Sequence, residues 1–199
     1  MKKVLIGAIV GGLIIFIWQF LSFALINFHK PAQQYTEKQD AIMNFLNSQQ
    51  LAEGGYIIPS LPDNATMDDH EQLMKTAEGK PWVNIQYHNS LKTNMVMNMI
   101  RGFITNIIII FLFCWLIQRM AAPRFGTIVT SALVVGLIVF LNAPYTGYIW
   151  YQNFDIWAHL ADAVVSWGLT GLWLAWWLRR EKVETNTVRV KESSMEMTN

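Results

Sequence analysis

The chain has 199 residues, of which 53% are hydrophobic and only 15% are charged. Soluble domains are usually about 25% charged, so this composition favours a membrane protein over a soluble one. The net charge of +1 gives no support for nucleic-acid binding, and a single cysteine excludes an intramolecular disulfide framework.

The first segment is apolar and long enough to cross a bilayer. It resembles a signal peptide, because Lys2 and Lys3 precede it and small residues stand at Ser22 and Ala24. Its apolar core, however, exceeds the 7–15 or so residues of a cleaved signal and matches the roughly 20 residues of a membrane span. We therefore expect an uncleaved transmembrane helix over 4–27.

The next segment, 28–100, is polar to mixed and predicts a small α/β insert. Thr36 and Gln39 form a plausible capping box for one short helix, and Thr66 with Asp69 can begin a second. A two-stranded ribbon is marginal by itself, so we expect the insert to lean on the membrane helices. The expected strands are 56–59 and 82–88.

Three further apolar spans follow, and a polar tail at 181–199 without periodicity is expected to be disordered. Pro144 is expected to end the second of these spans, before a loop rich in Tyr and Trp. The fold class predicted is an all-α integral membrane protein: a four-transmembrane-helix bundle with the insert between its first two helices. The three spans are 101–120, 126–143 and 155–178.

Basic residues near the ends of the spans predict the topology. Short loops decide it, and the short loop 145–154 contains no Lys or Arg. Both termini should therefore be cytoplasmic, with the insert outside, in what we expect to be a bacterial plasma (inner) membrane. The basic residues on the cytoplasmic side are Lys2, Lys3, Arg119, Arg124, Arg179, Arg180 and Lys182.

The last span carries a polar stripe. At about 100° per residue, Asp155, His159, Asp162 and Ser166 fall within a sector of about 60°. Ionisable groups in a membrane helix are costly, so they need partners or a function. Polar residues of the other spans lie at matching depth, which predicts a polar cavity open to the outside. The candidate residues are His159, Asp162, Arg101, Thr105, Asn98, Gln19 and Ser166, with Asn106 beside them.

Each of these residues also has a structural explanation. Asp155 can be a helix cap or an ion-pair partner, and Arg101 is our expected partner for Asp155 or Asp162. His159 and Asp162 can also bond to each other and fix helix packing. Because a catalytic zinc usually has three protein ligands and this pair supplies two, no metal or cofactor is expected. His29 or His88 could complete a ligand set in space, but the sequence does not show it.

The chain contains no Walker loop, no dinucleotide fingerprint, no His-Glu-x-x-His motif and no Gly-x-Ser-x-Gly motif. We therefore expect a non-enzymatic accessory or small-ligand-binding component of the membrane. One alternative is a membrane-embedded enzyme with His159 as acid/base, Asp162 as its orienting group and Arg101 as anion clamp. A second is a subunit of an oligomeric transporter. The expected partners are the lipid bilayer and a membrane protein or second copy, and no nucleic acid.

Overall fold

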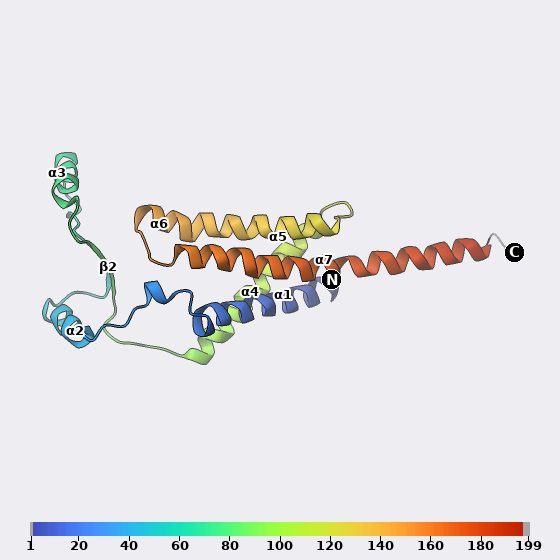
Figure 1. Ribbon diagram of the computed structural model, residues 1–199, viewed down its shortest axis with the longest axis horizontal. Coiled ribbons are helices and arrows are strands. Elements are labelled where there is room, and N and C mark those ends of the chain that lie inside the picture. Colours follow the sequence, from blue (N-terminus) through green and yellow to red (C-terminus); the bar gives the residue numbers. More distant parts are fainter. Residues whose placement is uncertain (1, 197–199) are drawn as a thin grey trace. The chain divides into compact units, whose positions relative to one another are not determined.

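The computed structural model describes the backbone of residues 2–196 and the side chains of residues 2–179 (Figure 1). The chain divides into two compact units: a helical unit, residues 1–34 and 94–199, and a small unit, residues 35–93. The tail predicted at 181–199 lies outside the residues that are described in full, so its disorder stays a prediction.

Three helical spans are long and apolar enough to cross a membrane, which indicates an integral membrane protein. The last helix, α7 (Ile156–Glu196), is not among the three, and its His159, Asp162 and tryptophans make it less apolar than they are. The spans are Lys2–Leu25, formed by α1 (Lys2–Phe20) and η1 (Leu21–Leu25); Met95–Gln118, which is α4; and Phe125–Trp150, formed by α5 (Phe125–Phe140), η3 (Leu141–Tyr145) and α6 (Thr146–Trp150).

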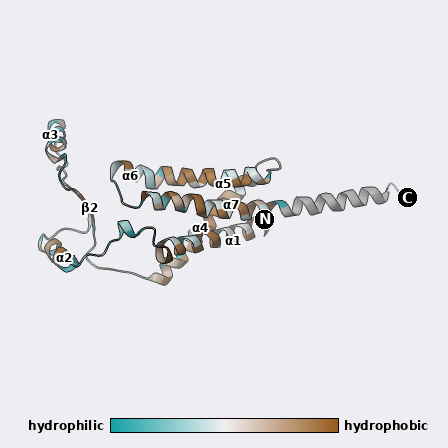
Figure 2. Ribbon diagram, in the orientation of Figure 1, coloured by the Kyte–Doolittle hydropathy of each residue, from teal (hydrophilic) through white to brown (hydrophobic). Residues whose placement is uncertain are grey.

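The surfaces of these helices are apolar where no other helix covers them. On α4, Ile104, Ile108 and Leu112 recur one turn apart and are each about half exposed. Figure 2 shows hydrophobic residues along the helices of this unit. An exposed apolar stripe of this length suits contact with lipid chains rather than with water.

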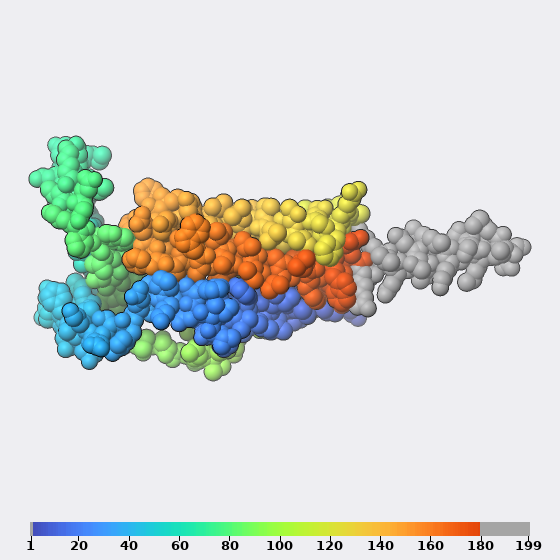
Figure 3. Space-filling view, in the orientation of Figure 1, coloured from blue at the N-terminus to red at the C-terminus, as the bar shows by residue number. Residues whose placement is uncertain are grey.

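Within the helical unit, α7 packs against both α1 and α5, and α4 packs against α1 (Figures 1 and 3). Glycines allow the helices to approach closely, as is common in membranes. A Cβ at Gly12 of α1 would lie 2.9 Å from the backbone nitrogen of Ile107 of α4. A Cβ at Gly136 of α5 would lie 2.8 Å from the carbonyl oxygen of Ala163 of α7. The small residues of these helices therefore set their spacing.

The core of this unit is formed by apolar side chains from all four long helices. Phe113 of α4 meets Trp167 of α7 edge to face, with ring centroids 5.7 Å apart, and Cys114 is fully buried beside them. The largest buried apolar members of the cluster are Ile15, Ile110, Phe113, Ile117, Ile128, Trp167 and Leu174.

Pro144 does not end its helix, contrary to the sequence-based expectation for 126–143. It lies inside η3, a π-helical turn through which α5 continues into α6. A π turn accommodates the missing N–H and the bulk of the proline ring, because its backbone is wider than that of an α-helix. The hydroxyl and the backbone N–H of Thr146 both donate to the carbonyl oxygen of Leu141, the hydroxyl at 2.7 Å.

The small unit contains two helices and a two-stranded antiparallel sheet, as predicted, with Tyr56 opposite Ile85. The Thr66 cap is confirmed, because Thr66 and Asp69 form a reciprocal capping box. The capping box predicted at Thr36 is wrong, because the hydroxyl of Thr36 accepts from the N–H of Lys38 outside the helix. The elements are α2 (Gln39–Ser48), β1 (Gly54–Ile58), α3 (Met67–Ala77) and β2 (Val83–Tyr87).

Candidate functional site

His29 lies immediately after the first membrane span and is brought back against it. The span ends in the π turn η1. After this turn, the N–H of Phe28 donates to the carbonyl oxygen of Ser22 at 3.0 Å. Asn27 then adopts a left-handed conformation, with φ 60°, which is uncommon outside glycine. The chain therefore reverses, and His29, which the sequence assigned to the insert, belongs to the helical unit.

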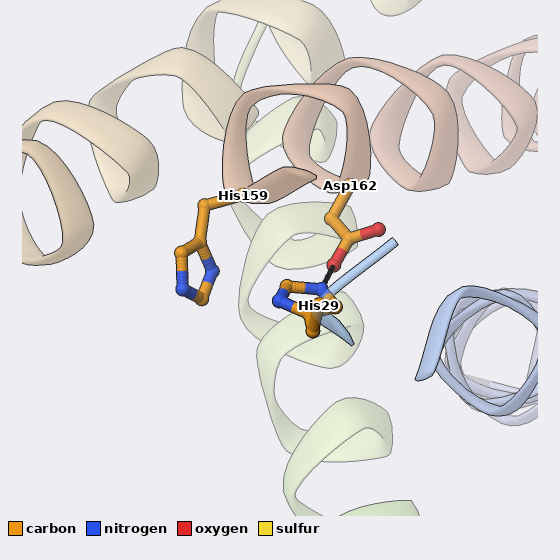
Figure 4. Close-up of side chains that lie close together, drawn as sticks. All are labelled: His29, His159 and Asp162. Carbon is orange, nitrogen blue, oxygen red and sulfur yellow. Dashed lines mark hydrogen bonds and ion pairs between the residues drawn. The ribbon is translucent and has the colours of Figure 1, made fainter. Parts of the chain in front are cut away.

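The imidazole of His29 is 1% exposed and contacts two carboxylates. Its Nδ1 lies 2.8 Å from Oδ2 of Asp155. Its Nε2 lies 3.0 Å from Oδ2 of Asp162, the contact drawn in Figure 4. The ring of Phe23 stacks on the imidazole at 3.7 Å. His29 is therefore fixed on both ring nitrogens and on one face.

Asp155 occupies the N-cap position of α7, and its carboxylate contacts two histidines. It directly precedes α7, and its backbone oxygen accepts from the N–H of His159 at 3.1 Å. Its carboxylate, however, contacts His29 and also lies 3.5 Å from Nε2 of His159. The carboxylate therefore contacts histidines rather than Arg101, the partner expected from the sequence.

His159 and Asp162 lie at the same end of α7 but bond to different groups. Asp162 accepts from Nε1 of Trp18 at 2.9 Å in addition to its contact with His29. His159 is 31% exposed, and its ring meets that of His29 edge to face at 4.9 Å. Figure 4 shows both histidines and Asp162 on the same side of α7. One ligand atom from each of His29, His159 and Asp162 lies within 4.8 Å of the others.

A pocket of about 260 Å³ adjoins this cluster. Its walls include His159 and Asp162, and Asn106 donates to Oε1 of Gln19 at 2.8 Å in the same wall. No described residue that lines the pocket is Lys or Arg. The polar or hydrogen-bonding side chains of the lining are Trp18, Gln19, Asn106, His159, Asp162, Ser166 and Trp167, and the others are apolar.

Three predicted cavity residues lie elsewhere. Arg101 is exposed and, within the described part of the chain, forms no ion pair with Asp155 or Asp162, whose carboxylates pair with histidines. Thr105 bonds back to the carbonyl oxygen of Arg101 at 2.8 Å, and Asn98 is exposed. These three share one stripe of α4, whereas Asn106, about 100° further round, faces the packed side.

His29 is the residue that sequence reasoning underestimated. The sequence indicates only that His29 could complete a ligand set, because nothing in the sequence places it beside α7. The available signal was its position directly after a membrane span, where a turn can return the side chain toward the helices.

No family model, curated protein or solved structure matches the chain.

Proposed function

We propose that the protein is a membrane component that crosses the bilayer four times, with the first part of α7 as the fourth span, and binds a small polar or cationic ligand in the pocket beside His159 and Asp162. The pocket opens on the outer face of the plasma membrane, and both termini are cytoplasmic. The observation that carries this proposal is the cluster of His29, Asp155, His159 and Asp162, of which His159 and Asp162 line the pocket.

The charge and size of the pocket support a small ligand that is not an anion. Its lining contains the carboxylate of Asp162 and no described Lys or Arg, so the local potential favours positive charge. Its volume of about 260 Å³ lies just below the 300 Å³ or so at which drug-sized ligand sites begin. The expected ligand is therefore an ion or a molecule of a few heavy atoms.

Binding is better supported than transport. Beyond Ser166, α7 contributes Thr170, which is fully buried, and then Leu174, which belongs to the apolar core. A transport path would need polar groups that continue to the other side of the membrane. The apolar core beyond Thr170 supports a pocket that is closed at its inner end.

The enzyme alternative loses the residue that was expected to bind an anion. Arg101 is not part of the pocket lining, so the group that would stabilise developing negative charge is missing from that arrangement. Binding therefore remains the proposal that needs the fewest further groups.

Thiol labelling can test the pocket, because Cys114 is the only cysteine and is buried. In a Cys114→Ala background, Ser166→Cys places a thiol in the lining. We expect a membrane-impermeant cationic methanethiosulfonate to modify it from outside intact cells. A cationic reagent should react several-fold faster than an anionic one, because the thiol lies near Asp162.

Leu169→Cys is a matched control on the same helix. Leu169 is 46% exposed on the apolar surface, so its thiol should face lipid and stay unreactive toward the same reagents. A Ser166→Cys protein that is folded but unreactive from the outside, or that prefers the anionic reagent, contradicts the proposal.

A further inference from the structure

We propose that His29, His159 and Asp162 bind one divalent transition-metal ion of the zinc class, and that Asp155 orients His29 as a ligand. This inference rests on the proposed function, since it names the ligand of the same pocket. Three of the four residues lie on or directly before the first turns of α7, and His29 follows the C-terminal end of the first span. The ion would therefore join two segments that are distant in sequence.

The hydrogen-bonding capacity of His29 is the first argument. A neutral imidazole has one N–H donor and one acceptor nitrogen. If Nδ1 donates to Asp155, Nε2 presents a lone pair to the carboxylate oxygen of Asp162, only 3.0 Å away. Two acceptors at this distance repel each other unless a cation is shared between them. The arrangement therefore requires either an additional proton or a metal ion at Nε2.

The charge of the cluster suits a divalent ion. The carboxylates of Asp155 and Asp162 contribute two negative charges, and they are only 9% and 18% exposed. One divalent ion brings the formal charge of the cluster to zero with both histidines neutral.

The positions of the donor atoms suit coordination. Zinc bonds nitrogen and oxygen ligands at about 2.0–2.2 Å, so adjacent ligands of a tetrahedral ion stand about 3.4 Å apart. His29 Nε2 and Asp162 Oδ2 are 3.0 Å apart, and the widest separation within the three-residue set is no more than 4.8 Å. His159 is partly exposed, so rotation of its ring can close the remaining distance.

The neighbouring contacts are those that support metal ligands. A metal-bound histidine usually donates its other N–H to a carboxylate, and Asp155 accepts from His29 Nδ1 at 2.8 Å. Trp18 donates to Oδ1 of Asp162 at 2.9 Å and leaves Oδ2 for the ion. Each ligand that His29 and Asp162 provide is thus held by a second residue.

The ligand types identify the class of ion and its open position. Two imidazoles and one carboxylate suit zinc, iron, cobalt or manganese, whereas calcium and magnesium prefer oxygen ligands alone. Three protein ligands leave one tetrahedral position free. Since His159 and Asp162 line the pocket, that position faces it, and a water or a small ligand can occupy it.

The test uses the full chain, purified with a tag that contains no histidine. After equilibrium dialysis against micromolar Zn²⁺, mass spectrometry should find one zinc ion per wild-type chain. Substitution with Co²⁺ should give the visible absorption of a four-coordinate nitrogen and oxygen site, and this spectrum can be measured on the wild-type protein. His159→Gln should weaken zinc binding at least tenfold and abolish the cobalt spectrum, and Asp155→Asn should weaken binding about 10–100-fold.

His88→Gln is the matched control, because His88 is exposed and pairs with Glu53 within the small unit. It should bind zinc as the wild type does. Wild-type protein without bound zinc and without a cobalt spectrum overturns the metal site, as does equal binding by His159→Gln. If Ser166→Cys is still labelled in that case, the pocket stands and only its assignment to a metal fails. Loss of both results rejects the proposed function as well.

Discussion

His29 and Asp155 are 126 positions apart in the chain, and yet Nδ1 of the histidine lies 2.8 Å from the aspartate carboxylate. This contact joins the end of the first membrane span to the beginning of α7. It also decides how the other groups interact, because it leaves the second nitrogen of His29 facing Asp162.

Asp155→Asn should destabilise the helical unit. Hydrogen bonds to charged groups contribute about 1.5–3 kcal/mol, and this contact is buried. We expect a loss of that size in reversible unfolding of the detergent-solubilised protein. Glu53→Gln removes an exposed contact with His88 and should cost less than about 1 kcal/mol. Equal effects of the two substitutions would argue against a structural role for the Asp155 contact.

Trp18→Phe removes the N–H that Asp162 accepts and keeps an aromatic ring in place. The expected loss is about 1 kcal/mol in the same unfolding measurement, together with weaker binding of any cation at Asp162. Trp150→Phe is a suitable comparison, because Trp150 is 75% exposed and should tolerate the change. A Trp18→Phe protein as stable as the Trp150→Phe protein would show that the bond contributes little.

Gly12→Ala should separate α1 from α4. The new Cβ would lie 2.9 Å from the backbone nitrogen of Ile107, and backbone cannot move aside as a side chain can. We expect a loss of about 1–3 kcal/mol, as for overpacked cores. Gly126→Ala, whose Cβ would have nothing within 4 Å, should be neutral or slightly stabilising because alanine favours helix. Similar stabilities for the two variants would contradict close packing at Gly12.

The capping box of α3 predicts a pH dependence in the small unit. Hydrogen bonds from the backbone N–H and the hydroxyl of Thr66 lower the pKa of Asp69 below its usual value of 3.8. A lowered pKa stabilises the folded helix above the unfolded pKa, and this contribution disappears as the pH falls through the lowered value. The protection of the first-turn amides of α3 against hydrogen exchange, relative to their intrinsic exchange rates, should therefore decrease below about pH 4. In the Asp69→Asn variant, the same amides should be less protected at neutral pH, and their protection should no longer change below about pH 4. An unchanged pH profile in that variant would exclude Asp69 as the titrating group.

Helix boundaries show which local signals are reliable. Thr66 and Asp69 predicted their cap correctly, because a capping box involves only residues three apart. Pro144 was misleading, because the cost of proline in a helix depends on whether the backbone can widen into a π turn there. The polar stripe of α4 was misleading for another reason: Arg101 and Asn106 are close in sequence, but only Asn106 lies on the side that packs against α1.

The sequence by itself determined the apolar spans, the membrane class and the presence of costly ionisable groups at His159 and Asp162. These properties follow from composition and from the fixed period of a helix, which depend on neighbouring residues only. The tertiary structure alone decided that His29, rather than Arg101, meets those groups. That outcome depends on the left-handed turn at Asn27 and on the packing of α7 against α1, which bring together residues that no local pattern connects.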